Sequence, residues 1–182
     1  MNFILIGCRA SGKTSVGRRL AGLLGRPFYD TDALIRQRTG MTVKEMVAAG
    51  GWLSFREAEK AAVAGLAGEE GAVIALGGGA VLDPANVEAL KPRGFFIWLQ
   101  AGQEAIRDRL AGDGATAEQR PPLPPAGNAD DEEILRQRRP IYAALAGLTI
   151  DTTGRSIEEV AGEIVRAIAP PHPPSPPLRG RG

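Results

Sequence analysis

The stretch that decides the fold is GCRASGKT, residues 7–14, which follows the apolar run Phe3 to Ile6 and leads into a segment of helical period at residues 13–24. Its spacing is G-x-x-x-x-G-K-T, the pattern of a phosphate-binding loop between a strand and a helix. Gly7 and Gly12 stand where a side chain would block an anion from the backbone N–H groups. The sequence therefore predicts a nucleotide phosphate site at the start of the first helix.

The other residues of this loop suit the same role. Lys13 can reach the outer phosphates, and the Thr14 hydroxyl can complete a Mg²⁺ shell. A glycine-rich turn that only caps a helix is the alternative interpretation. Cys8 lies inside the loop, as a small filler or as a thiol made reactive by the helix N-terminus. We expect nucleotide contacts from Gly7, Ala10, Ser11, Gly12, Lys13, Thr14 and Ser15.

Composition narrows the possible chemistry. The 182 residues are 43% hydrophobic, so one compact domain is expected. Because 22 Lys plus Arg are balanced by 21 Asp plus Glu, the net charge supplies no overall electrostatic attraction for nucleic acid or a membrane. The one histidine, His172, lies in a proline-rich tail, which argues against a Ser-His-Asp triad or a histidine-built zinc site. The one cysteine cannot form an internal disulfide and suits a reducing compartment, so we expect a cytoplasmic protein without anchor or signal peptide.

Short apolar runs alternate with segments of helical period, which predicts an α/β fold with a parallel sheet and right-handed crossovers. The expected strands are residues 3–6, 27–29, 73–76, 95–99 and 148–150. The expected helices are residues 13–24, 32–38, 43–49, 54–67, 84–90, 103–110, 130–145 and 156–168.

Two stretches break this alternation. Residues 111–128 are rich in Gly, Ala and Pro and have neither period, which indicates a mobile lid or a disordered insertion. Residues 169–182 hold six of the 14 prolines and are expected to be a disordered tail, with a proline-binding partner as the alternative. The expected domain is therefore residues 1–168.

Two further motifs follow expected strands, at the sheet edge where open α/β sheets bind ligands. Asp30 and Asp32 are two apart, so in extended geometry both carboxylates point to one side, toward a metal and a substrate hydroxyl. Helix capping by Asp32 or Thr31 is the alternative. Gly77-Gly78-Gly79 offers bare backbone to a ligand, or is only a loose turn.

Four arginines occupy ligand-like positions: Arg56, Arg109, Arg120 and Arg138. Arginine can hold a carboxylate bidentately or stabilise a transferring phosphoryl group. For each of them taken singly, a solvated helix face is the competing interpretation.

Taken together, these motifs resemble the shikimate kinase family from about residue 2 to residue 168. The resemblance rests on their common order: GCRASGKT (7–14), FYDTD (28–32), FREAE (55–59), GGG (77–79), QRPPL (119–123), RRPIY (138–142) and IDT (150–152). It implies a three-layer P-loop NTPase fold with a five-stranded parallel sheet in the order 2-3-1-4-5. It also implies a substrate-binding region at about residues 32–60 and a lid at about residues 111–128.

The resemblance also implies residue roles. Asp32 would contact the shikimate hydroxyls, and Asp30 with Thr14 would hold Mg²⁺. Arg56 and Arg138 would clamp the substrate carboxylate, while the backbone of Gly78 and Gly79 would contact the ring. Lys13, Asp32 and Arg120 would be catalytic, with Arg120 reaching the phosphates from the lid, and Arg109 and Arg155 would flank adenine. The lid departs from the family pattern, because Arg-Pro-Pro-Leu stands where Arg-Pro-Leu-Leu is usual.

The implied activity is ATP-dependent phosphorylation of the 3-hydroxyl of shikimate, with Mg²⁺, by a monomer. A related small-molecule kinase, such as a gluconate kinase, and a catalytically inactive nucleotide-binding regulator are the rival hypotheses. Intact Lys13, Thr14, Asp30, Asp32 and Arg120 argue against the inactive regulator.

Overall fold

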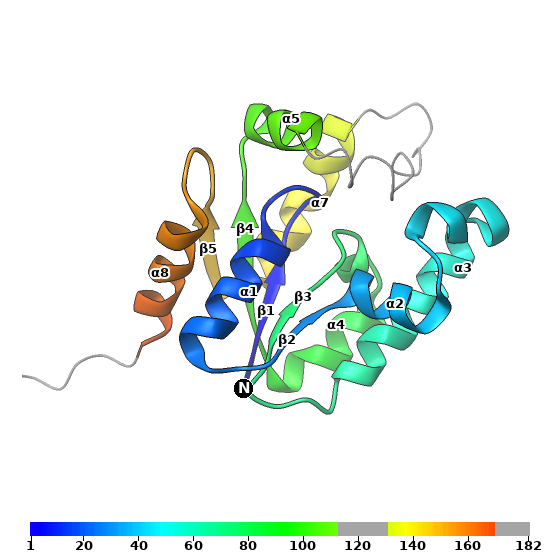
Figure 1. Cartoon of the computed structure of the whole chain (residues 1–182), viewed down its shortest axis with the longest axis horizontal. Helices are drawn as coiled ribbons and strands as arrows, with labels where there is room; N and C mark the ends of the chain where they lie inside the picture. Colours follow the sequence, from blue (N-terminus) through cyan, green and yellow to red (C-terminus); the bar gives the residue numbers. More distant parts are fainter. Residues whose placement is uncertain (113–130, 170–182) are drawn as a thin grey trace, which may run out of the picture.

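Five parallel strands form one sheet in the order β2-β3-β1-β4-β5 (Figure 1), the order implied by the family resemblance. The computed structural model describes residues 1–112 and 131–169. The strands are β1 Asn2–Ile6, β2 Phe28–Asp30, β3 Val73–Ala75, β4 Gly94–Gln100 and β5 Leu148–Asp151. The helices are α1 Lys13–Leu24, α2 Thr31–Thr39, α3 Val43–Leu66, α4 Pro84–Leu90, α5 Gln103–Gly112, α7 Asp131–Leu145 and α8 Ile157–Ile168.

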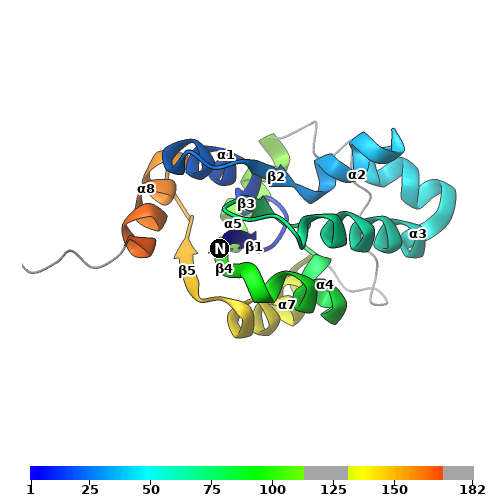
Figure 2. The ribbon, with the colours of Figure 1, turned by 90° about the horizontal axis from the view of Figure 1, so that it is seen from below.

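The central strand β1 feeds two apolar cores, one on each face of the sheet. Phe3 and Leu5 pack with α1 and α8, whereas Ile4 and Ile6 pack with α3, α4 and α7. Because successive side chains of a strand point to opposite faces, a continuous apolar run produces this double burial. The view from below shows the resulting three layers, with α1 and α8 on one side of the sheet and α4 and α7 on the other (Figure 2).

The region that follows β2 forms a helical arm beside the sheet (Figure 1). Two expected helices, residues 43–49 and 54–67, form the single element α3, which is broken where Gly51 adopts a φ of 71°. Thr42 and Glu45 form a capping box at its start. A third apolar cluster, built around Ile35, Met46 and Phe55, holds α2 and α3 together within this arm.

Two stretches continue further into regular structure than the sequence predicts. Ala111 and Gly112, which were expected to open the lid, are the last residues of α5, because the helical backbone outlasts the apolar period that ends at Leu110. Ala169 was assigned to the tail, but its N–H donates to the carbonyl of Val165 as the C-cap of α8. The rest of the expected lid, with Arg120, and the tail from residue 170 lie outside the described residues.

No helix in the ranges 1–112 and 131–169 combines the length and the apolar character needed to cross a membrane.

Gly17 sets how closely α1 approaches the sheet. A Cβ at this position would lie 2.5 Å from the Phe28 ring and 3.0 Å from a methyl of Leu5. We expect Gly17→Ala to lower the free energy of unfolding by about 1–3 kcal/mol, the usual cost of overpacking. Gly22→Ala is the matched control in the same helix, since nothing lies within 4 Å of its added methyl. The control should gain roughly 0.5–1 kcal/mol, and equal effects of the two changes in urea unfolding would contradict the packing argument.

Candidate active site

The loop at residues 7–14 turns sharply at the carboxyl end of β1. Gly7 has a φ of 143°, and a Cβ there would lie 2.5 Å from the carbonyl oxygen of Leu99. Gly12 has a φ of 93° and forms the N-cap of α1 without any side-chain hydrogen bond. The first-turn N–H groups of α1 are therefore not capped by a side chain, as an anion site at a helix N-terminus requires.

Two side chains line this anion site. The Lys13 ammonium folds back over the loop and donates to the carbonyls of Gly7 at 2.9 Å and Cys8 at 2.6 Å. The Ser11 hydroxyl is buried and has no hydrogen-bond partner within the described part of the chain. A buried hydroxyl without a partner is costly, so this group is a candidate donor to a bound phosphate.

The thiol of Cys8 faces the apolar core rather than the phosphate site. It packs with Ala101 and Ile106. Burial raises its pKa and outweighs the opposing charge of Lys13. A protonated, buried thiol supports the filler interpretation over the reactive one.

Asp30 has two tasks at the end of β2. Its Oδ2 accepts a hydrogen bond of 2.7 Å from the Thr14 hydroxyl. Its Oδ1 accepts the N–H groups of Asp32 at 3.0 Å and Ala33 at 3.2 Å, so Asp30 itself is the N-cap of α2. The alternative interpretation, with Asp32 or Thr31 as the helix cap, is wrong by one or two positions, since the cap is Asp30 and α2 begins at Thr31.

The Thr14 and Asp30 pair suits a magnesium ion. Both groups are hard oxygen donors, and Mg²⁺ is commonly held by one or two protein oxygens together with substrate phosphates and water. Across the described ranges, no group of three or more His, Cys, Asp or Glu residues could hold a metal on its own.

A pocket of about 470 Å³, part of it open solvent, lies beside the phosphate loop. Its lining brings together residues that are far apart in the sequence: Arg9, Asp32, Val43, Trp52, Phe55, Arg56, Glu59, Gly77, Gly78, Gly79 and Arg138. All the expected acceptor contacts, namely Asp32, Arg56, Gly78, Gly79 and Arg138, are in this set. With both acids ionised, three arginines face two carboxylates, which leaves one excess positive charge for an anionic ligand.

The triple glycine is a close-packed wall of this pocket rather than a loose turn. A Cβ on Gly77 would lie 2.7 Å from Oε1 of Glu59, and one on Gly79 would overlap the Arg56 guanidinium. A Cβ on Gly78 would lie 3.3 Å from the carbonyl oxygen of Gly7. Any side chain in the loop would therefore displace a pocket residue or crowd the phosphate loop.

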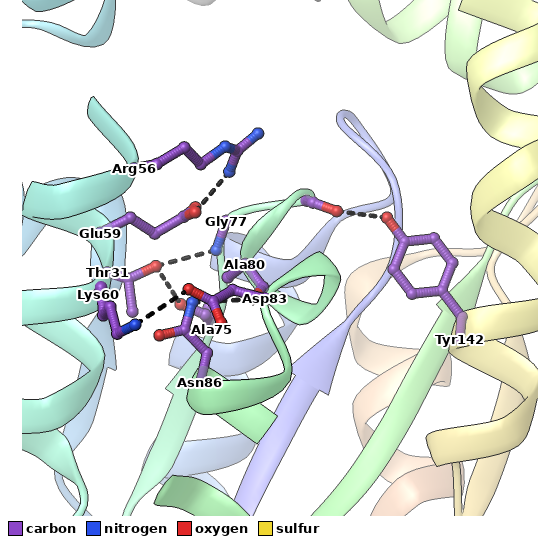
Figure 3. A network of polar contacts seen from close by, with 11 residues as sticks. Thr31, Arg56, Glu59, Lys60, Ala75, Gly77, Ala80, Asp83, Asn86 and Tyr142 are labelled. Atoms are coloured by element: carbon purple, nitrogen blue, oxygen red, sulfur yellow. Dashed lines mark hydrogen bonds and ion pairs between the residues drawn. The ribbon is translucent and has the colours of Figure 1, made fainter. Parts of the chain in front are cut away.

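Side chains from the surrounding helices hold this wall in place (Figure 3). The Gly77 N–H donates to the buried hydroxyl of Thr31 at 2.9 Å. The hydroxyl of Tyr142 donates to the carbonyl of Gly78 at 2.5 Å. Asn86 donates to the carbonyl of Ala80 at 2.9 Å. The loop is thus fixed from α2, α7 and α4.

Arg56 is oriented by its neighbours on α3. Its guanidinium forms an ion pair with Glu59, whose side chain is only 2% exposed (Figure 3). Its Cζ lies 5.8 Å from the centre of the Trp52 ring and 5.4 Å from that of Phe55. Burial raises the pKa of Glu59, while the charge of Arg56 opposes the shift. The pair places a fixed guanidinium at the pocket wall.

Arg109 links the phosphate loop to a distant part of the chain. Its guanidinium donates to the carbonyl of Ala10 at 3.1 Å and to the carbonyl of Thr152 at 2.7 Å, which joins the phosphate loop to the turn after β5. Arg155 instead forms an ion pair of 2.5 Å with Glu163 and donates to the carbonyl of Asp151. Of the two expected adenine-flanking arginines, the structure brings Arg109 to the loop.

The polar residues of the site that the sequence reasoning missed include Arg9, Thr31, Glu59 and Tyr142. Glu59 had a usable signal, because it stands three residues after Arg56 on a helix and so lies on the same face. Arg9 lies within the loop motif at a position that the motif leaves open. Thr31 and Tyr142 act through contacts between distant segments, for which the sequence offers no local pattern.

Three kinds of comparison with known proteins find shikimate kinases. A family model described as shikimate kinase matches residues 9–169. The chain is 48% identical over 176 residues to a shikimate kinase of Syntrophus aciditrophicus, covering 91% of this chain and 89% of the relative. The solved structure of the Acinetobacter baumannii shikimate kinase in complex with shikimate aligns with a TM-score of 0.80 at 34% identity, covering 92% of each chain. The crystal structure of the Aquifex aeolicus shikimate kinase aligns with a TM-score of 0.76 at 29% identity, covering 92% of this chain and 95% of that one.

Because Asp30 both caps α2 and contacts Thr14, substitution by Asn and substitution by Ala should affect stability differently. Asparagine can still cap α2 through its side-chain oxygen, and its NH₂ group can donate to the Thr14 hydroxyl, so Asp30→Asn should change the free energy of unfolding by only a few tenths of a kcal/mol. Asp30→Ala removes the cap and should cost about 1 kcal/mol. Urea unfolding of both variants measures this difference, and a loss in Asp30→Asn as large as in Asp30→Ala would refute the capping role.

Proposed function

This chain belongs to the shikimate kinase family, and from that premise we propose that it transfers the γ-phosphoryl group of ATP to the 3-hydroxyl of shikimate. The observation that carries the proposal is the pocket beside the phosphate loop, where Asp32, Arg56 and Arg138 converge around the glycine wall. One carboxylate suits a hydroxyl acceptor, and two arginines suit a carboxylate on the same small molecule.

In the proposed reaction, Asp32 orients the 3-hydroxyl and accepts its proton as the bond to phosphorus forms. Lys13 stabilises negative charge on the transferring group, since its ammonium already lies over the phosphate loop. Arg56 and Arg138 hold the substrate carboxylate and so fix the hydroxyl in line with the donor. Arg120 is proposed from its motif alone as a further cation at the phosphates.

We infer that Mg²⁺ accompanies ATP and that Thr14 and Asp30 supply its protein ligands. When bound, the ion would neutralise charge on the phosphate oxygens. Monomeric action in the cytoplasm, without a nucleic acid or membrane partner, remains a prediction from composition and from the family.

A coupled assay of ADP release tests the function directly. We expect ATP turnover with shikimate, little turnover with gluconate, and only slow ATP hydrolysis without an acceptor. The methyl ester of shikimate is the matched control for the arginine clamp, because it keeps the 3-hydroxyl and lacks the charged carboxylate. Turnover with gluconate alone would support the related sugar-acid kinase. No turnover with any acceptor, in a protein that binds ATP, would support the inactive regulator.

Asp32→Asn tests the acceptor role. The amide keeps the size of the side chain but cannot take the proton, so kcat should fall on the order of a hundredfold or more. Nucleotide affinity, measured by calorimetry with ADP, should stay near that of the unchanged protein, because the phosphate loop is untouched. Near-normal turnover in this variant would remove Asp32 from the reaction.

A further inference from the structure

Tyr142 lies at the back of the glycine wall, on the side away from the pocket lining. Its side chain comes from the last turn of α7 and packs in the core, with its ring centre 5.9 Å from that of Trp98. Only the hydroxyl leaves this apolar setting, and it donates to the carbonyl of Gly78 at 2.5 Å (Figure 3). Burial raises the pKa of Tyr142 to about 12, with Arg138 opposing the shift, so the phenol is a proton donor at neutral pH.

The carbonyl that Tyr142 holds belongs to the same planar peptide group as the N–H of Gly79. In a trans peptide the two bonds point in opposite directions, so fixing the carbonyl also fixes the direction of the N–H. A hydrogen bond to the carbonyl oxygen further polarises the peptide and makes the N–H a stronger donor. A group that holds the Gly78 carbonyl at the back of the wall therefore fixes the direction of the Gly79 N–H on the other side.

The N–H groups of Gly78 and Gly79 are available for this purpose. Other polar groups of the loop are used within the protein, since Gly77 N–H donates to Thr31 and the Gly77 and Gly79 carbonyls accept from Ala80 and Leu82. Within residues 1–112 and 131–169, neither the N–H of Gly78 nor that of Gly79 donates to a backbone carbonyl. Two unused backbone donors in the wall of a pocket are candidate contacts for a polar ligand.

We propose that Tyr142 is a positioning residue for the acceptor, which acts by holding the Gly78 carbonyl so that the Gly79 N–H is directed at a substrate oxygen. This inference rests on the proposed function, because it takes shikimate as the occupant of the pocket. Tyr142 also stands one helical turn after Arg138, on the same face of α7.

Tyr142→Phe removes the hydroxyl and keeps the ring in the core. We expect KM for shikimate to rise about five- to thirtyfold, the effect of leaving one buried hydrogen bond unmade. KM for ATP should stay within about twofold, because the phosphate loop keeps its own contacts. Tyr29→Phe is the matched control. It deletes the hydroxyl of the only other tyrosine, which donates to Glu69 at 3.1 Å and lies outside the pocket lining.

A spectroscopic measurement separates positioning from general stability. In the unchanged protein, shikimate should shift the ¹⁵N–¹H resonance of Gly79, and Tyr142→Phe should reduce that shift while Tyr29→Phe leaves it intact. An unchanged Gly79 shift in Tyr142→Phe, or equal rises in both KM values, would overturn the positioning role even where thermal stability falls. If the unchanged protein turns over shikimate and Tyr142→Phe matches it, this inference fails and the proposed function stands. If the unchanged protein does not use shikimate, both fail.

Discussion

The backbones of two glycine-rich loops approach one another with no side chain between them. A Cβ on Gly78 would lie 3.3 Å from the carbonyl oxygen of Gly7 and 3.5 Å from the nitrogen of Arg9. This contact sets the separation between the phosphate site and the acceptor pocket. Phosphoryl transfer depends on positioning more than on covalent chemistry, so a short and fixed separation is the property that the fold has to supply.

Fixing that separation needs support from every element around the glycine wall. Glycine costs more conformational entropy on folding than any other residue, so three in a row would be a mobile segment in isolation. Here Thr31, Asn86 and Tyr142 hold the loop by hydrogen bonds, while Arg56 and Glu59 fill the space that glycine side chains would occupy. The bare backbone is therefore rigid because distant helices supply what its own side chains cannot.

The sequence predicted the parts of the site that are encoded locally. The phosphate loop can be predicted from the sequence because its function requires glycine at fixed spacing in a strand-loop-helix setting. The positions of Asp30 and Gly77 at the ends of β2 and β3 could also be predicted, since the apolar runs stop there. Tyr142 could not be assigned a role, because its hydroxyl meets Gly78 across 64 positions of the chain. The sequence placed Glu59 only as a neighbour of Arg56, and its contact with the Gly77 backbone comes from tertiary packing.

Asp30 shows how strongly local folding and the proposed chemistry are coupled in this site. The same carboxylate caps α2 with one oxygen and contacts Thr14 with the other. A metal at Thr14 would therefore meet an oxygen whose orientation is already set by two backbone N–H groups of α2. Asp32 lies in the first turn of the same helix. The cap that orients Asp30, the proposed metal ligand, therefore also fixes the backbone that carries Asp32, the proposed proton acceptor. A rotation of the Asp30 carboxylate would break the cap of the turn that carries Asp32, which couples the geometry of the donor side to that of the acceptor side.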